Sequence, residues 1–532
     1  MTLSLPPLAL RLRRLTHAAL GRRAERWLLC GAAAAAGLMI GWAMGWAGGV
    51  WLASAGLLLW FAAQRVASRH GLRQEAVLLW VGVAGWTVAG MGWSADAVRA
   101  EDPLAGVWRL AVLVVLVVWH GGLATFSWWL PRRWLARRGP ADMAAVVALC
   151  LALAAMDALK QWGWTGHGYA QLASLTVDLP GAPAWLPRLG GAGVALMLSM
   201  WCAWLALAPR ALLIPVALLA GWGLGAMPAV ALPSTAEADA QAWPLLQLRA
   251  VQAPQGSAAW SLAERDARLE RLHQASALAP AGSVLVAAEG FLAEAPPQPA
   301  VGVWADLLDA LAARQQHLLI GMPAQGRDGD EPVSFTALWQ FSPGRSDLAA
   351  KQRLVPGGEY LPWPAGLAWL WRHVFASAKL QHRPGPDALT RPLHMQGSEL
   401  GVLVCHELSL NITAAERAQG AQWLLNPSDE QWLASPLFRH QMQALARLRA
   451  LEFQKPLLRV LSDEHSVLVS PDGGAPVVTA PVDAAALVHW RLQPREARTP
   501  AERHAEITSI FLVLLPWLSA GLARWRPARA AV

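Results

Sequence analysis

The sequence predicts a mixed fold, in which a polytopic α-helical membrane domain of about eight spans carries an α/β domain between spans seven and eight. Three observations support this prediction. Of the 532 residues, 55% are hydrophobic and only 15% are charged, whereas soluble globular chains are nearer a quarter charged. The apolar residues gather in long runs near both ends of the chain. The stretch between them has an ordinary globular composition, with alternating strand and helix patterns.

The apolar runs before residue 235 predict seven membrane spans, because one span needs about 20 apolar residues. Trp27–Gln64 carries no formal charge and is long enough for two spans, with glycines at 45–49 marking a hairpin between them. The other spans are Ala76–Trp93, Leu110–Leu130, Met143–Met156, Gly190–Leu207 and Ala211–Leu232, and an eighth is Ile507–Leu522. The predicted domains are therefore a transmembrane domain at 1–235, a soluble domain at 243–498 and a C-terminal transmembrane helix at 507–523.

Arginines predict the orientation of these spans, because cytoplasmic loops carry an excess of Lys and Arg. Clusters precede span one, follow spans two and four, and end the chain, whereas the alternate loops are poorer in positive charge. Both termini are therefore predicted in the cytoplasm and the soluble domain outside, in the periplasm of a Gram-negative host. The Arg-rich start resembles the beginning of a signal peptide, but because spans follow at once we expect no cleavage.

Composition excludes several classes of protein. Four cysteines are too few for a disulfide scaffold, and the apolar content excludes a disordered chain or a collagen-like fibre. The formal net charge of +8 suggests nucleic acid at first sight. The positive charge, however, flanks the apolar runs, and the soluble part has no basic stripe with interleaved aromatics. No nucleic-acid partner is therefore expected.

The soluble part predicts a layered α/β fold, in which active residues tend to follow strand C-terminal ends. The predicted strands are Leu245–Val251, Ser283–Ala287, His317–Gly321, Ser334–Phe341, Gly401–Val404, Trp423–Asn426, Leu457–Leu461 and Ser466–Ser470. The predicted helices are Leu262–Ala277, Trp304–Arg314, Ala414–Gln419 and Pro436–Gln454. The sequence has no P-loop, dinucleotide fingerprint, HExxH or CxxC motif, so no cofactor and no metal are expected.

Three segments of this part carry candidate catalytic residues. Ser283–Glu289 is an apolar strand that ends in a carboxylate, Lys351–Tyr360 is a loop with a lysine and the second carboxylate Glu359, and Gly401–Glu407 is an apolar strand that leads to Cys405. Cys405 is the only cysteine outside the predicted spans.

These residue types suit acyl transfer through a thioester. A thiol is mostly protonated at neutral pH and needs a base, a role that Glu289 at a strand end can fill. Lys351 can stabilise both the thiolate and the oxyanion of a tetrahedral intermediate, and Glu359 can hold Lys351 charged and correctly aimed.

A Cys405–His406 dyad is less favoured, because neighbours on a strand point to opposite faces of the sheet. On the same argument Glu407, two residues after Cys405, would share the face of the thiol.

The chain order Glu, Lys, Cys resembles the nitrilase (carbon–nitrogen hydrolase) superfamily. With the predicted spans, the chain resembles that superfamily's membrane-anchored apolipoprotein N-acyltransferase family. Lys351–Tyr360 is similar to the family's lysine loop and Gly401–Glu407 to its cysteine strand. His440–Glu452 with Lys455–Arg459 is similar to its following helix and strand, and Ser466–Gly474 to the next strand and turn. The resemblance implies a nitrilase-like fold of the αββα type.

The resemblance also implies a reaction in two steps. Cys405 would take an acyl chain from a phospholipid and pass it to the N-terminal amine of a diacylglyceryl-cysteine lipoprotein. Glu289 would be the base, Lys351 would stabilise the oxyanion, and Glu359 and Glu407 would support them. The partners implied are a phospholipid donor, a diacylated lipoprotein acceptor and the lipid bilayer, and the location implied is the bacterial inner membrane.

A tryptophan-rich stretch, Trp363–Phe375, fits an interfacial segment through which acyl chains could reach the thiol. Its candidate substrate-binding residues are Trp363, Trp369 and Trp371.

The sequence departs from the family pattern at positions that flank the expected pocket, namely Ala288, His406, Ser428–Trp432 and Ser462–His465. Two alternative functions therefore stay open. One is a membrane-tethered amidase or hydrolase of the nitrilase type, and the other is a catalytically silent relative with an envelope or conjugation-associated role. A transporter is least favoured, because the spans contain few ionisable residues.

Overall fold

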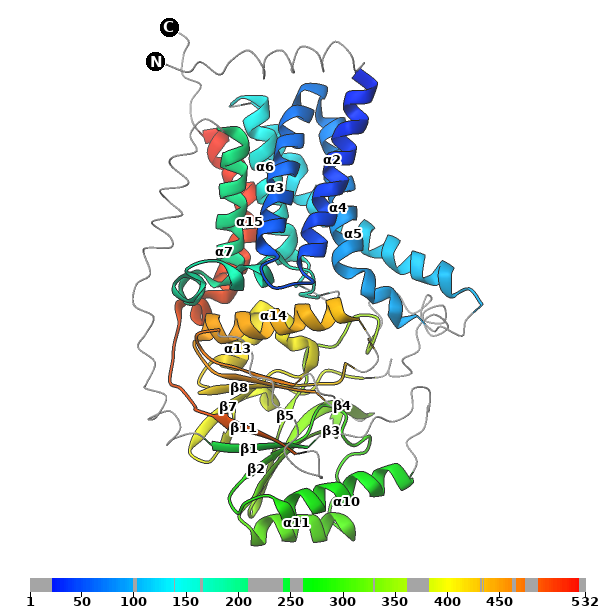
Figure 1. The fold of residues 1–532 in the computed structure, drawn as a ribbon, viewed down its shortest axis with the longest axis vertical. Coiled ribbons are helices and arrows are strands. Elements are labelled where there is room, and N and C mark those ends of the chain that lie inside the picture. Colours follow the sequence, from blue (N-terminus) through cyan, green and yellow to red (C-terminus); the bar gives the residue numbers. More distant parts are fainter. Residues whose placement is uncertain are drawn as a thin grey trace, which may run out of the picture.

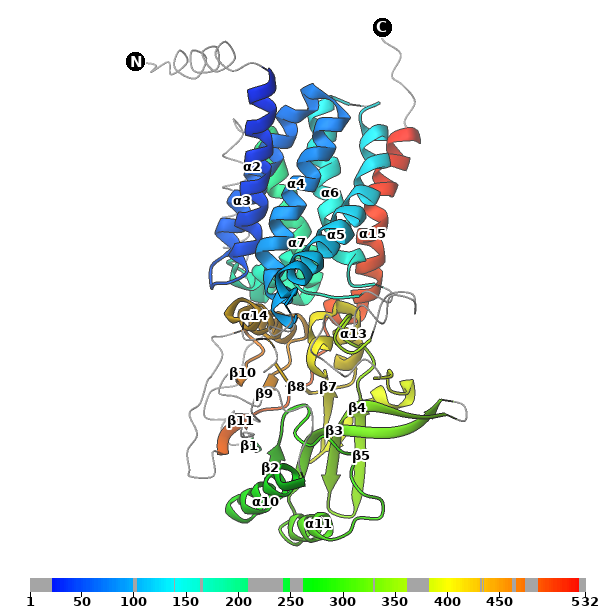
Figure 2. The same ribbon diagram turned by 90° about the vertical axis from the view of Figure 1, so that its right-hand side faces the viewer.

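The computed structural model describes most of the chain, as a helical bundle joined to an α/β domain (Figures 1 and 2). The described residues are 22–98, 103–137, 139–162, 166–208, 243–248, 262–328, 331–360, 382–430, 433, 435–461, 466–473 and 487–525.

The bundle consists of α2 (Arg22–Ala43), α3 (Val50–Ala67), α4 (Leu72–Met91), α5 (Ala105–Leu135), α6 (Ala141–Leu159), α7 (Ala182–Leu207) and α15 (Pro500–Trp525). Among the described residues, six helical segments, those of α2 to α7, are each long enough and apolar enough to cross a membrane. They coincide with the first six predicted spans. The predicted span Ala211–Leu232 lies outside the described residues, and α15 covers the predicted eighth and packs against α5, α6 and α7. The total of eight spans stays a prediction.

Small residues allow close helix packing in the bundle. A Cβ atom on Gly37 of α2 would lie 2.0 Å from the carbonyl oxygen of Gly82 on α4. A Cβ on Gly41 would lie 2.6 Å from backbone atoms of the same helix. Because van der Waals packing drives helix association where water is absent, such small-residue contacts are typical of membrane helices.

Ion pairs fasten the end of the bundle that faces away from the α/β domain. Arg132 of α5 donates two hydrogen bonds of 2.6 Å to Glu75 of α4, and both side chains are buried. Arg65 of α3 pairs with Asp142 of α6 at 3.2 Å. The first residue of α2 and the last of α15 lie at this same end (Figures 1 and 2).

The α/β domain contains two sheets. The six-stranded sheet has the order β11 (Leu487–Leu492), β1 (Trp243–Leu248), β2 (Val284–Val286), β3 (His317–Asp328), β4 (Glu331–Ser342) and β5 (Arg345–Ala350). The five-stranded sheet has the order β10 (Val467–Val469), β9 (Leu457–Leu461), β8 (Trp423–Ser428), β7 (Ser398–Val402) and β6 (Leu393–Met395).

Helices cover the outer faces of these sheets. Residues of α10 (Leu262–Leu278) and α11 (Val303–Ala313) pack on the first sheet, while α13 (Asn411–Ala418) and α14 (Pro436–Phe453) lie on the second (Figure 2). Apolar side chains of both sheets form a core between them. The predicted αββα layers are therefore confirmed. The 3-10 turns are η1 (Ser68–His70), η2 (Gly92–Ala97), η4 (Leu172–Asp178), η7 (Asp387–Thr390) and η8 (Cys405–Ser409).

The eight predicted strands and four predicted helices of this domain are all found; Leu457–Leu461 has the predicted ends and the others have shifted ends. Three strands were missed, β5, β6 and β11. β5 begins with the polar residues Arg345–Asp347 at a sheet edge, and β6 has only three residues, so neither gives a clear alternating pattern. One shifted boundary affects the site: the strand predicted at Gly401–Val404 ends at Val402, and Cys405 begins the turn η8.

The five-stranded layer faces the bundle. α14 runs across its end, with α13 beside it (Figures 1 and 2). Phe438 of α14 packs against Trp93 and Tyr169 of the bundle's connecting segments, with ring centroids 4.6 and 5.7 Å away. A continuous apolar core joins the bundle to α14. The turn η8 therefore lies on the membrane side of the α/β domain.

Candidate active site

Three chain segments converge between the two sheets. Glu289 follows β2, which lies between β1 and β3 in parallel pairing with both. Lys351 follows β5 at the edge of the same sheet. Cys405 follows β7 of the other sheet, which pairs in parallel with β8. The three candidate residues therefore come from the ends of strands in both layers.

Lys351 joins the two candidate carboxylates. Its Nζ donates to Oε1 of Glu289 at 3.0 Å and to Oε1 of Glu359 at 2.7 Å, and its side chain is fully buried. The second oxygen of Glu289 accepts from the backbone N–H of Asp429 at 3.1 Å, and that of Glu359 from Val355 at 2.8 Å. Both carboxylates are thus oriented by a backbone donor as well as by the ammonium.

The charges of this cluster keep Lys351 protonated. Burial alone would lower its pKa, but the electrostatic interactions with Cys405 when it is ionised, with Glu289 and with Glu359 raise the pKa well above the ordinary lysine value. For Glu359, burial alone would raise the pKa, but the ion pair with Lys351 outweighs burial, so the pKa of Glu359 is lowered. The site therefore contains a fixed positive charge beside the thiol.

Cys405 occupies a strained backbone position. Its φ is +52°, in the left-handed region that non-glycine residues rarely adopt. Asn426 Nδ2 donates to the Leu403 and Cys405 carbonyls, the second at 3.0 Å. Ser428 donates its hydroxyl to Glu430 Oε1 at 3.2 Å and lies near enough to the thiol to act on its pKa. Asn426 of β8 thus holds the backbone of Cys405, and Ser428 of the same strand lies near its thiol.

Burial raises the pKa of the Cys405 thiol, and the charges of Glu289 and Glu359 act in the same direction. Lys351 and the nearby Ser428 hydroxyl lower the pKa without cancelling the rise. The resting thiol is therefore neutral at ordinary pH, and a thiolate forms only when a base accepts its proton.

Glu407 ties the lysine loop to the cysteine turn. Its Oε1 accepts from the backbone N–H groups of Gln352 at 2.8 Å and Arg353 at 3.1 Å, and Arg417 contacts it at 3.4 Å. Its Oε2 accepts from Val404 N–H at 2.9 Å. The carboxylate is fully buried. It can thus set the spacing between Lys351 and Cys405.

We expect Glu407→Gln to lower the free energy of unfolding by about 3 kcal/mol, because the change leaves buried Arg417 without its counter-charge. Unfolding followed by tryptophan fluorescence in detergent measures the loss. Glu416→Gln, at an exposed position on α13, is the matched control and should leave stability within about 0.5 kcal/mol. Equal stability of the two variants would contradict this role of Glu407.

The side-chain directions of His406 and Glu407 were predicted from the alternation of a strand. That reason was wrong, because Cys405–Ser409 is a 3-10 turn. His406 Nδ1 lies 3.3 Å from Oγ of Ser409, and its ring centroid is 5.7 Å from that of Tyr169. Burial lowers the pKa of His406 to about 3, so its ring is neutral. His406 thus contacts Ser409 of its own turn and Tyr169 of the membrane part, which favours a structural role.

Sequence reasoning missed several residues of the site. Asn426 ends the predicted strand Trp423–Asn426, and Ser428 is the first residue of the departure from the family pattern at 428–432, but neither was assigned a role at the site. Tyr169 comes from the loop before α7 and packs against His406. Burial, followed by the charge of Cys405, raises the pKa of its phenol well above the ordinary value. Its only sequence signal is rarity, since the chain has two tyrosines.

Other predicted positions are only partly described. Trp363, Trp369 and Trp371 lie outside the described residues, as do Gln431, Trp432 and 462–465. Ala288 is buried in the core between the sheets. Glu430 forms a buried ion pair with Arg459 of β9. Among the described residues, no group of three or more His, Cys, Asp or Glu side chains could hold a metal ion.

The chain has full-length relatives among known proteins, although no family model matches it. It is 28% identical over 471 residues to the apolipoprotein N-acyltransferase of Azotobacter vinelandii, covering 82% of this chain and 83% of the relative. It is 29% identical over 491 residues to that of Parasynechococcus marenigrum, covering 88% and 95%. The Pseudomonas putida protein of the same name is 26% identical over 454 residues, covering 81% and 85%.

Among solved structures, the NitN amidase from Neterenkonia sp. AN1 aligns at a TM-score of 0.30 with 17% identity, over 51% of this chain and 99% of the amidase.

The relatives match across both the helical bundle and the α/β domain, since each alignment covers more than four fifths of the chain. The bundle's apolar helices agree with this, so the protein is a membrane protein. Over most of its length the chain is therefore similar to proteins named apolipoprotein N-acyltransferase.

Proposed function

We propose that this protein transfers a fatty acyl chain from a phospholipid, through a thioester on Cys405, to the N-terminal amine of a diacylglyceryl-cysteine lipoprotein. The observation that carries the proposal is the buried Glu289–Lys351–Glu359 ion-pair cluster, whose charges act on the Cys405 thiol. The names of the full-length relatives support the same reaction. The catalytic residues proposed are Glu289, Lys351 and Cys405, with Glu359 and Glu407 as supporting residues.

In the first step, Glu289 accepts the thiol proton and the Cys405 sulfur attacks an ester carbonyl of the phospholipid. Lys351 stabilises the oxyanion of the tetrahedral intermediate. The intermediate collapses to a thioester, the carbon–oxygen bond to the glycerol breaks, and the lysophospholipid oxygen takes the proton from Glu289. Glu359 holds Lys351 in place.

In the second step, the acceptor amine attacks the thioester carbonyl beside Lys351. Glu289 accepts a proton from the amine, the carbon–sulfur bond breaks, and an amide forms. The proton passes to the departing sulfur, which restores the Cys405 thiol and the Glu289 carboxylate. The resting enzyme is regenerated without any other reactant.

The proposed location is the bacterial inner membrane, with seven spans at 1–235, the α/β domain at 243–498 on the periplasmic side and an eighth span at 507–523. The arginine-rich end of the bundle, away from the α/β domain, supports cytoplasmic termini. Both proposed substrates are lipids, so a site on the membrane side of the α/β domain would meet them at the bilayer surface.

Incubation of the detergent-purified protein with a phospholipid and a synthetic diacylated lipopeptide tests the function. We expect an N-acylated peptide, detected by mass spectrometry. Release of free fatty acid without peptide acylation would instead favour the membrane-tethered hydrolase. Absence of any product, with an active relative run in parallel, would favour the catalytically silent alternative.

The raised pKa of the Cys405 thiol predicts the pH dependence of its alkylation. Because the thiolate is the reactive form, the rate of modification by iodoacetamide should rise steadily from pH 7 to pH 9, without the levelling that an exposed cysteine of ordinary pKa, about 8.5, begins to show there. Peptide mass spectrometry resolves Cys405 from the bundle cysteines. A plateau below pH 8 would contradict this prediction.

A further inference from the structure

The loop between α6 and α7 contacts the turn that carries Cys405. The side-chain amide of Gln171 donates to the carbonyl oxygen of Ser409 at 3.0 Å and to that of Gly168 at 2.7 Å. The backbone N–H of Gly168 donates to Ser409 Oγ at 3.2 Å. Gln171 is 1% exposed. The last residue of η8 is therefore held by a segment of the membrane part.

The two segments approach too closely for a side chain at position 168. A Cβ atom on Gly168 would lie 1.9 Å from the carbonyl oxygen of Ser409, which is far inside van der Waals contact. Next to it, the Tyr169 ring packs against His406, the residue after Cys405. The loop 166–171 thus contacts both the middle and the end of the cysteine turn.

The α/β domain holds the same turn from the other side. Arg449 of α14 donates to the carbonyls of Leu408 at 3.1 Å and Ser409 at 3.3 Å. The beginning of the turn is held by the bonds of Asn426 and Glu407 described above. Because the turn is only five residues long, movement of its end at Ser409 is transmitted to the strained backbone of Cys405.

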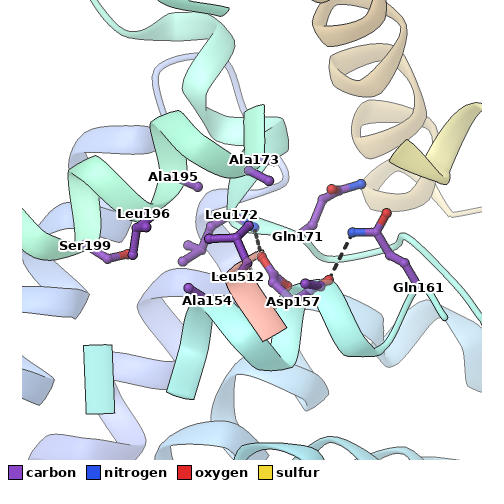
Figure 3. A pocket seen from close by; sticks show the side chains of 12 residues that line it. Ala154, Asp157, Gln161, Gln171, Leu172, Ala173, Ala195, Leu196, Ser199 and Leu512 are labelled. Carbon is purple, nitrogen blue, oxygen red and sulfur yellow. Dashed lines mark hydrogen bonds between the residues drawn. The ribbon is translucent and has the colours of Figure 1, made fainter. Parts of the chain in front are cut away.

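The loop itself is anchored to the bundle. Asp157 of α6 accepts the backbone N–H of Leu172 at 2.8 Å, immediately after Gln171. Figure 3 shows Asp157, Leu172 and Gln171 around a small pocket between this loop and helices α6 and α7. Gln171 is therefore supported by transmembrane helices rather than by the domain whose turn it contacts.

We propose that the membrane part completes the catalytic site, with Gln171 as the residue that positions the Cys405 turn. The inference rests on the proposed role of Cys405 as nucleophile. Reacting atoms must be held close to their attack geometry, and a misplacement of about 1 Å can cost about a hundredfold in rate. The bundle would then set the position of the sulfur as well as anchor the domain.

The test compares Gln171→Met with Gln441→Met in the full-length protein. Gln441 of α14 is equally buried and makes two bonds across the interface, donating to Gly90 O at 2.7 Å and accepting from Ala170 N–H at 3.4 Å. It does not bond to the cysteine turn in the described structure. Gln171→Met loses one hydrogen bond across the interface and one within its own loop, whereas Gln441→Met loses two across the interface. A purely structural effect should therefore be at least as large in Gln441→Met.

We measure the rate of acyl-adduct formation on Cys405 by intact mass, as a function of phospholipid concentration. Gln171→Met should lower the maximal rate by about tenfold or more with little change in half-saturating phospholipid, while Gln441→Met stays within about twofold. Gly168→Ala, which forces Ser409 away, should lower the maximal rate at least as much as Gln171→Met.

Equal losses in Gln171→Met and Gln441→Met, or a wild-type rate in Gln171→Met, would overturn the positioning role. A melting temperature for each variant shows that the protein compared is folded. Failure of the underlying function is a separate result, because the wild-type protein would then form no adduct on Cys405 at all.

Discussion

Replacement of Cys405 with alanine is expected to abolish the acyl adduct and all lipopeptide acylation, a loss of at least about a thousandfold. The reason is chemical, since every step of the proposed reaction forms or breaks a bond to this sulfur. The other three cysteines belong to bundle helices and are far along the chain from the ion-pair cluster. Intact mass after incubation with phospholipid detects the adduct as an increase of one acyl chain.

Two controls make this result specific. A triple variant, Cys30→Ala with Cys150→Ala and Cys202→Ala, should keep both the adduct and the transferase activity, because Cys405 remains. The Cys405→Ala protein should unfold at a temperature close to that of the wild type, since the substitution removes only one sulfur atom from the core. Full acylation by the Cys405→Ala protein would refute the mechanism.

Replacement of Glu289 with glutamine should separate thiol reactivity from catalysis. The Glu289 charge raises the pKa of the Cys405 thiol, so its removal should lower that pKa and make alkylation by iodoacetamide faster at pH 7.5. Acyl transfer should nevertheless fall by about a hundredfold or more, because no carboxylate remains to carry the proton between sulfur, leaving group and amine. Lys351 keeps Glu359 as its counter-ion.

The opposite changes in the two rates make this prediction hard to meet by accident. A damaged site would slow both reactions, and an irrelevant residue would change neither. Glu399→Gln, at an exposed position of β7 where the carboxylate pairs with His394, serves as the matched control and should leave both rates at the wild-type value. Unchanged acyl transfer in Glu289→Gln would exclude Glu289 as the base.

Some features of the fold could be predicted from local sequence because they depend on local physics. The apolar runs of α2 to α7 are long enough to span a membrane whatever surrounds them. The buried strand β2 is continuously apolar, and β9 is apolar except for Arg459, a pattern typical of parallel buried strands. Strand β5 was missed because its first half is polar and its place is decided by pairing with β4.

The site residues show the same division. Glu289 and Cys405 follow apolar strands, so the sequence could nominate them. The path of the chain after β7 could not be predicted, because the left-handed backbone of Cys405 is held by Asn426, which lies on another strand. Nor did the predicted helix Pro436–Gln454 indicate that its Arg449 and Glu452 side chains are buried.

The sequence by itself determined that this chain has membrane helices, a layered α/β domain and a chemically coherent set of Glu, Lys and Cys residues, because hydrophobic periodicity and side-chain chemistry are local properties. Only the tertiary structure decided that Lys351 pairs with both carboxylates and that Gln171 contacts the turn of Cys405. Those contacts join residues 62 and 238 positions apart. Such distant segments are brought together by the packing of whole layers, and no local pattern encodes that packing.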